Sequence, residues 1–177
     1  MKPSLARIRS RAKKIRLLLL DVDGVLTDGR IIIDDRGVET KQFHSRDGQG
    51  IALLLRAGIE VGFISARTSA AARRRAKELG VRLVRQGVRD KIQAYNEIKR
   101  ERGLRDAEIA YVGDDLVDWP LLQRAGLGVC VGDAWRELRP RVHWVTRAFG
   151  GAGAVREVAD LLLKAQGKQV DLTKRVL

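Results

Sequence analysis

The sequence predicts an α/β fold in which a parallel β-sheet lies between two layers of helices. Short apolar runs alternate with segments of helical character along the whole chain. These runs are continuously apolar, as strands buried on both faces of a sheet are. The 177 residues, 45% hydrophobic and 32% charged, suffice for one globular domain, and no repeat or linker divides them. We therefore expect a single Rossmann-like three-layer domain over residues 1–177, with right-handed crossovers.

The predicted first strand organises the rest of the chain. An apolar run over residues 15–20 follows a basic segment, residues 3–13, that we expect to form a short helix, and it precedes Asp21, Asp23 and Gly24. Ligands bind beyond the carboxyl ends of parallel strands, and two carboxylates this close repel each other unless a cation lies between them. Local turn chemistry explains Asp-x-Asp-Gly equally well, so the motif alone leaves a metal site and a turn both open.

A β-hairpin is predicted next, as a flap over about residues 25–43. Two β-rich runs, residues 30–33 and 38–43, flank a polar turn that ends in Gly37. Three consecutive isoleucines, Ile31–Ile33, place apolar side chains on both faces of a hairpin that is marginal alone. We expect the hairpin to pair with other copies of itself in a homo-oligomer; packing on its own domain is the alternative.

Helices and strands then alternate to the end of the chain. Asp47 is a predicted N-cap and Gly58 a predicted helix stop. The expected helices cover about residues 47–57, 70–79, 91–102, 120–125 and 152–165. The further strands are expected over residues 60–64, 81–84, 108–112, 127–131 and 143–146. The tail, residues 166–177, has no clear period, and we expect it to be mobile.

Reactive polar residues follow four of these strands and are expected to converge at one edge of the sheet. They are Asp21 with Asp23, then Ser65, then Lys91, then Asp114 with Asp115 and Asp118. Carboxylates from two strands can hold Mg²⁺. A carboxylate that attacks phosphorus forms an aspartyl-phosphate, and a serine and a lysine can hold the phosphoryl oxygens. The pattern indicates phosphoryl-transfer chemistry.

The order of these motifs resembles that of the haloacid dehalogenase superfamily. A closer resemblance is to the family of 3-deoxy-D-manno-octulosonate 8-phosphate (KDO 8-phosphate) phosphatases, and it covers nearly the whole chain. It rests on three segments: Asp-Val-Asp-Gly-Val-Leu-Thr-Asp-Gly over residues 21–29, Phe-x-x-Arg-Asp-Gly-x-Gly over residues 43–50, and Gly-Gly-x-Gly-Ala-Val-Arg-Glu over residues 150–157. One departure is Ala66, where the family usually has glycine, which puts backbone contacts to phosphate in doubt.

The resemblance implies a Mg²⁺-dependent phosphatase that releases KDO and phosphate in lipopolysaccharide precursor synthesis. It implies Asp21 as nucleophile and Asp23 as general acid/base, with Asp23 also binding Mg²⁺ through its backbone carbonyl. It further implies Asp114 as the third metal ligand, with Asp115 and Asp118 acting through water or orienting the ligands. Ser65 and Lys91 are the implied phosphate ligands. The residues implied on the sugar side are Arg46, Asp47, Gly48 and Arg67. Each of the last four also has a purely structural alternative: Asp47 as an N-cap, Gly48 as a backbone fit, and Arg46 and Arg67 as surface charges.

The resemblance also implies an assembly. Family members lack a large cap domain, in agreement with the short segment between Gly24 and Arg46. The resemblance implies a tetramer in which the hairpins meet at the centre and neighbouring subunits complete each site. We accordingly expect a homotetramer acting on a small phosphorylated acidic sugar. The nearest alternative is a phosphatase for a nine-carbon acid sugar phosphate, sialic acid 9-phosphate or its deaminated relative KDN 9-phosphate.

Composition bounds the remaining possibilities. A net charge of +13 and a pI of about 10.7 raise the alternative of a nucleic-acid-binding protein. Aromatic residues are only 5% and do not alternate with basic ones, so nucleic acid is not the expected partner and a surface that attracts anionic substrates is favoured. No apolar run reaches about 18 residues, and no secretory leader is recognised. The single cysteine, Cys130, fits a cytoplasmic protein.

Overall fold

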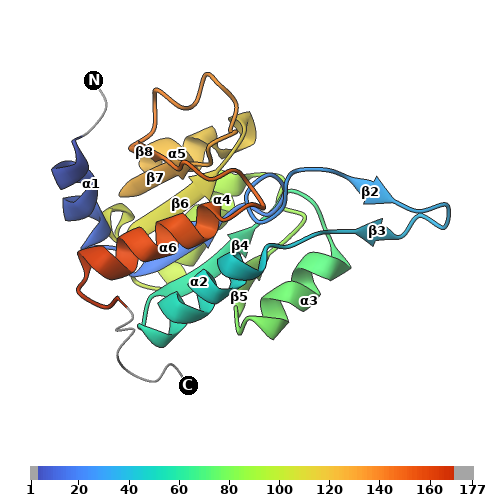
Figure 1. Cartoon of the computed structure of the whole chain (residues 1–177), viewed down its shortest axis with the longest axis horizontal. Helices are drawn as coiled ribbons and strands as arrows, with labels where there is room; N and C mark the ends of the chain where they lie inside the picture. The colour runs from blue at the N-terminus through green and yellow to red at the C-terminus, as the bar shows by residue number, and fades with distance from the viewer. Residues whose placement is uncertain (1–3, 170–177) are drawn as a thin grey trace.

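A computed structural model of the chain describes residues 4–169 and confirms the predicted α/β fold (Figure 1). Six parallel strands form one sheet in the order β5-β4-β1-β6-β7-β8. The strands are β1 (Leu17–Leu20), β4 (Glu60–Ile64), β5 (Leu83–Arg85), β6 (Ile109–Gly113), β7 (Leu127–Cys130) and β8 (Trp144–Val145). The central strand β1 is completely buried, which explains why its sequence is an uninterrupted leucine run.

Helices cover both faces of this sheet. They are α1 (Leu5–Ala12), α2 (Ser45–Arg56), α3 (Ala70–Glu78), α4 (Lys91–Glu101), α5 (Trp119–Arg124) and α6 (Ala154–Ala165). The helices α1 and α2 pack against α6 on one side, and α4 packs against α5 on the other (Figure 1). The predicted N-cap of α2 is wrong: the helix begins at Ser45, and the imidazole of His44 accepts a hydrogen bond from the amide of Arg46 at 3.2 Å.

The predicted hairpin is present but has a shorter ladder than expected. Strands β2 (Ile32–Ile33) and β3 (Glu39–Thr40) pair antiparallel and project beyond the end of the sheet (Figure 1). Asp34 closes the turn, because its carboxylate accepts hydrogen bonds from the amides of Arg36 and Val38. Four apolar residues of the hairpin are 41–58% exposed: Ile31, Ile32, Ile33 and Val38.

The C-terminal segment starts packed against the domain. The side-chain amide of Gln166 donates hydrogen bonds to the carbonyl oxygens of Ala12 and Ile15, and the ammonium group of Lys168 donates one to the carbonyl of Ala57. The rest of the tail that we expected to be mobile, residues 170–177, lies outside the described residues. Among the helices of residues 4–169, none combines the length and the apolar character that a membrane span requires.

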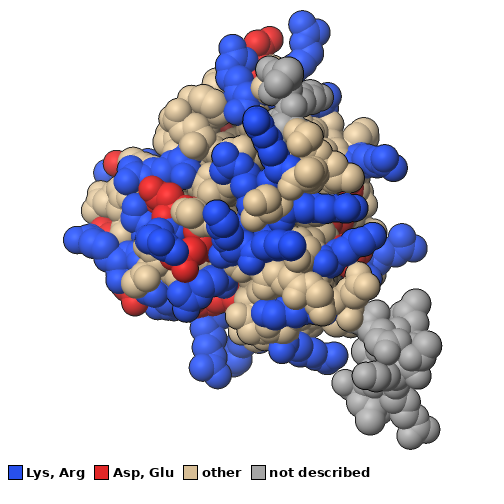
Figure 2. Space-filling view, turned by 90° about the vertical axis from the view of Figure 1, so that its left-hand side faces the viewer, with Lys and Arg blue, Asp and Glu red and all other residues tan. Residues whose placement is uncertain are grey.

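Basic side chains also occur on parts of the surface that are far from the strand ends with the predicted site. Figure 2 shows the face of the molecule that carries α1, on the side away from the hairpin, where Lys and Arg side chains are numerous. Helix α1 contributes exposed side chains there from Arg7, Arg9 and Arg11. The positive charge is therefore not confined to the edge of the sheet where the predicted site lies.

Candidate active site

The carboxyl ends of the three central strands bring most of the predicted residues into one pocket of about 260 Å³. Asp21 follows β1, Ser65 follows β4 and Asp114 follows β6, while Lys91 is the first residue of α4. Because these parallel strands are neighbours, residues far apart in sequence meet at one edge. The lining residues are Asp21, Asp23, Gly29, Ser65, Ala66, Arg67, Lys91, Asp114, Asp115 and Val117.

A buried lysine, Lys91, lines this pocket. The Nζ atom of Lys91 is 2.7 Å from Oδ1 of Asp21 and 2.7 Å from Oδ1 of Asp118, and all three side chains are at most 9% exposed. Burial alone would lower the pKa of Lys91, but the two carboxylates outweigh it and raise that pKa. Lys91 therefore provides a fixed positive charge beside Asp21.

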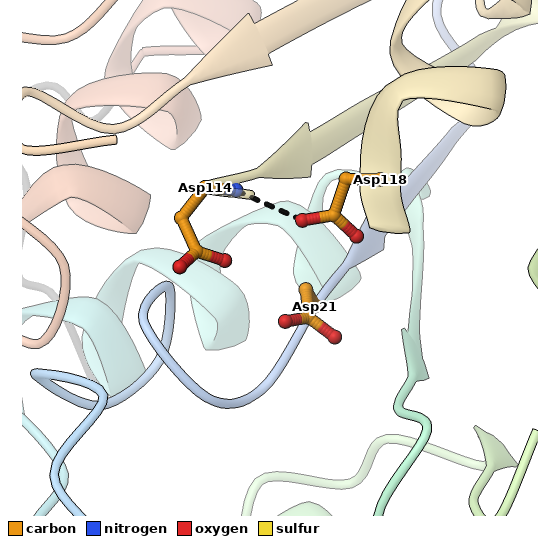
Figure 3. A group of neighbouring side chains, drawn as sticks. All are labelled: Asp21, Asp114 and Asp118. Carbon is orange, nitrogen blue, oxygen red and sulfur yellow. Dashed lines mark hydrogen bonds between the residues drawn. The ribbon is translucent and has the colours of Figure 1, made fainter. Parts of the chain in front are cut away.

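Asp118 orients its neighbours from a fully buried position. Its Oδ1 accepts a hydrogen bond of 2.6 Å from the hydroxyl of Tyr111, in addition to the one from Lys91. Its Oδ2 accepts a hydrogen bond from the amide of Asp114 at 2.9 Å (Figure 3). The same oxygen accepts one from the amide of Asp115 at 3.3 Å. Burial, followed by the charge of Asp118, raises the pKa of Tyr111 well above its usual value, so this phenol stays a donor.

The acidic cluster fits a hard divalent cation. Asp21, Asp114 and Asp118 each offer an oxygen, and these oxygens all lie within 4.8 Å of one another (Figure 3). Burial, then repulsion from Asp118, raises the pKa of Asp21 to about 7 and that of Asp114 to about 8. A cation between them would relieve this cost. Since both oxygens of Asp118 already accept hydrogen bonds, the side chains of Asp21 and Asp114 are the ones that would hold Mg²⁺.

Gly24 makes room for this arrangement. Its backbone has φ of +88°, and a Cβ atom there would lie 2.1 Å from Oδ2 of Asp114. Any larger residue would be strained and would displace that carboxylate. The Asp-x-Asp-Gly motif therefore combines a turn with a cation site, and the two readings of the motif are compatible.

Asp23 also lines the pocket, and it is not a member of the acidic cluster. Its Oδ1 accepts a hydrogen bond from the ammonium group of Lys41, and its Oδ2 lies 4.0 Å from Nε of Arg67. Lys41 comes directly after β3 of the hairpin and was not predicted as a site residue. Asp115 also lines the pocket, but its carboxylate accepts a hydrogen bond from the following amide, that of Leu116, at 2.7 Å.

The segment that follows β4, residues 65–67, is unstrained despite its alanine. No residue other than glycine has a positive φ within residues 4–169, so Ala66 fits its backbone conformation. The Ser65 hydroxyl is buried and accepts a hydrogen bond of 3.1 Å from the amide of Arg67. Ser65, Ala66 and Arg67 all line the pocket, so the segment with the alanine stays beside the site.

Three residues expected on the sugar side do not line the pocket of their own chain. Asp47 is buried, and its carboxylate accepts hydrogen bonds from the amides of Gly153 at 3.2 Å and Arg156 at 2.7 Å, so that it caps the start of α6. Gly48 fits against Arg75, whose Nη2 would lie 2.3 Å from an added Cβ. Arg46 is exposed outside the pocket. Of the four, only Arg67 lies in it.

Comparisons with known proteins agree with this geometry. A family model described as haloacid dehalogenase-like hydrolase matches residues 81–154. The chain is 46% identical over 166 residues to the 3-deoxy-D-manno-octulosonate 8-phosphate phosphatase KdsC of Escherichia coli (strain K12), which covers 94% of this chain and 88% of the relative. It is 47% identical over 158 residues to KdsC of Yersinia pestis, covering 89% and 84%.

Solved structures give the same result. The phosphatase of Yersinia pestis superposes with a TM-score of 0.90 at 46% identity, covering 92% of this chain and 88% of that one. The phosphatase of Moraxella catarrhalis, solved with a magnesium ion, a phosphate ion and KDO, superposes with a TM-score of 0.91 at 41% identity, covering 93% and 94%. The chain is therefore a phosphoric monoester hydrolase, and it belongs to the KDO 8-phosphate phosphatase family of haloacid dehalogenase-like hydrolases.

Proposed function

We propose that this protein hydrolyses KDO 8-phosphate to KDO and inorganic phosphate through a phosphorylated Asp21. The observation that carries the proposal is the contact of Lys91 with Asp21 beside Asp114, in a pocket at the ends of three parallel strands. A fixed ammonium group, a carboxylate that can attack, and a second carboxylate for a cation are the groups that this chemistry needs. The high identity to KdsC proteins supports the choice of substrate.

In the first step, a carboxylate oxygen of Asp21 attacks phosphorus and the bond to the sugar oxygen breaks. Lys91 and Ser65 hold the non-bridging oxygens, so that they are fixed while negative charge develops on them. The metal would be held by the side chains of Asp21 and Asp114 and the backbone carbonyl of Asp23. When bound, Mg²⁺ neutralises phosphoryl charge and orients the group for in-line attack.

Asp23 is the proposed general acid/base. Its carboxyl group donates a proton to the departing 8-oxygen of the sugar, and the resulting carboxylate then takes a proton from the water that attacks the aspartyl-phosphate. The position of Asp23 in the pocket, outside the acidic cluster, suits this role because its side chain is not needed as a metal ligand.

We propose that a homotetramer completes the sugar side of the site. The exposed isoleucines of the hairpin supply an apolar surface for contacts between copies. Arg67 would face the sugar within its own chain, whereas Arg46, which is outside its own pocket, would reach a sugar only through such an assembly. We also propose a cytoplasmic location. It is supported by Cys130, which is buried and unpaired, because unpaired cysteines are usual in a reducing compartment.

The test is a comparison of kcat/KM for KDO 8-phosphate, sialic acid 9-phosphate and KDN 9-phosphate with Mg²⁺. We expect KDO 8-phosphate to have the highest value, and the Asp21→Asn variant to release no phosphate because an amide is not a nucleophile. A higher kcat/KM for a nine-carbon substrate would overturn the substrate assignment. Release undiminished by Asp21→Asn would overturn the mechanism.

A further inference from the structure

We propose that Lys41 of the hairpin is a positioning residue that holds the carboxylate of Asp23 in its working orientation. This inference rests on the proposed function, in which Asp23 serves as general acid/base. It makes the hairpin a working part of the active site of its own chain, in addition to any contact it makes with other copies.

Lys41 is a buried lysine with two carboxylate partners. Its side chain is only 1% exposed, and its ammonium group donates a hydrogen bond to Oδ1 of Asp23 and lies 3.2 Å from Oε1 of Glu39. Burying an ammonium group is costly unless it is paired, so this lysine is not an ordinary surface charge. Within residues 4–169, Lys41 is the one donor hydrogen-bonded to the Asp23 side chain.

The hairpin supplies both the lysine and its anchor. Glu39 is in β3 and Lys41 directly follows that strand; the 3.2 Å between Nζ of Lys41 and Oε1 of Glu39 shows that the two side chains lie on the same side. Glu39 is fixed in turn, because its Oε2 accepts a hydrogen bond of 2.7 Å from Nη2 of Arg67 in the pocket wall. The chain of contacts runs from Arg67 through Glu39 and Lys41 to Asp23.

Each of the two aspartates that carry the proposed chemistry is therefore held by its own lysine. Lys91 from α4 holds Asp21, and Lys41 from the hairpin holds Asp23. A general acid contributes only when its proton lies within hydrogen-bond reach of the leaving oxygen, and misplacement by about 1 Å can cost about 100-fold. Loss of Lys41 should thus slow the step that needs a proton for the leaving group.

The experiment uses two substrates that differ in this need. KDO 8-phosphate has a sugar alkoxide as leaving group, which requires protonation, whereas p-nitrophenyl phosphate has a leaving group that departs without it. Rapid-quench measurement of phosphoenzyme formation isolates the first step for each substrate. The variants are Lys41→Met, Glu39→Gln as a milder loss of the anchor, and Lys14→Met as a matched control on the opposite edge of the sheet.

We expect Lys41→Met to slow phosphoenzyme formation from KDO 8-phosphate by about 10- to 100-fold and from p-nitrophenyl phosphate by less than about 3-fold. Glu39→Gln should give a smaller selective loss, and Lys14→Met none. Equal slowing with both substrates in Lys41→Met and Glu39→Gln, or no slowing with KDO 8-phosphate, would overturn the positioning role. Failure of the wild-type protein to react with KDO 8-phosphate would instead overturn the proposed function.

Discussion

Replacement of Lys91 by methionine tests the electrostatics of the pocket directly. Methionine keeps most of the volume of lysine but removes the charge that Asp21 and Asp118 share at 2.7 Å. Breaking a buried ion pair by removing one partner costs about 3–5 kcal/mol, because the other charge is left uncompensated. We expect Lys91→Met to lose about this much free energy of unfolding at pH 8 without metal.

The loss of stability in Lys91→Met should be larger at pH 8 than at pH 5.5. The pKa of Asp21 is raised from 3.8 to about 7 and that of Asp114 to about 8. The folded state therefore keeps protons that the unfolded chain releases, and its stability falls as pH rises from about 4 through 7 to 8. Without Lys91 the pKa of Asp21 rises further. At pH 5.5 this carboxyl group is protonated in the variant, so the destabilisation should be smaller there.

The assay is urea unfolding followed by circular dichroism at pH 5.5 and 8, with EDTA and at fixed protein concentration. Lys14→Met serves as the control, because Lys14 is exposed and precedes the opposite end of β1. Added Mg²⁺ should restore part of the stability of Lys91→Met at pH 8, because it supplies positive charge to the same carboxylates. Equal losses at the two pH values, or a loss below about 1 kcal/mol at pH 8, would refute this reasoning.

Three further predictions concern other parts of the site. Asp47→Ala should cost about 1–3 kcal/mol in free energy of unfolding, because two amides at the start of α6 lose their acceptor. It should change kcat/KM by less than about 3-fold. A raised KM without a loss of stability would instead indicate that Asp47 contacts the sugar. Mg²⁺ affinity, measured by calorimetry, should rise between pH 6 and 8 by up to about 10-fold per pH unit for each proton displaced from Asp21 or Asp114, and a flat profile would contradict their raised pKa values. Gly24→Ala and Gly58→Ala should each lose about 1–2 kcal/mol of stability, since both glycines have positive φ. Only Gly24→Ala should also weaken Mg²⁺ binding, because its methyl group meets Asp114 while nothing lies within 4 Å of Gly58; equal Mg²⁺ affinities of the two variants would contradict this.

The sequence was sufficient to predict the fold and the convergence of the strand-end residues. Asp21, Ser65 and Asp114 each follow a buried apolar run, and the topology of a parallel sheet then dictates where they meet. Lys91 could be added because it begins the helix after the next strand. These positions are tied to main-chain elements that apolar patterning reveals.

Contacts between groups that are distant in the sequence could not be predicted from apolar patterning. Asp47 caps a helix whose amides lie more than 100 positions further along the chain, so its local setting at the start of α2 was misleading. Tyr111 reads as a core residue of β6, and only the structure reveals its hydrogen bond to Asp118. Lys41 directly follows the polar strand β3, and its hydrogen bond to Asp23 depends on how the hairpin folds back.

The most direct test of the account is a crystal structure grown with Mg²⁺ and phosphate. We predict one metal ion between the carboxylates of Asp21 and Asp114, with the phosphate against Ser65 and Lys91. Carboxylates of Asp21 and Asp114 that share no ion, with phosphate bound elsewhere, would contradict the central claim that this edge of the sheet performs phosphoryl transfer.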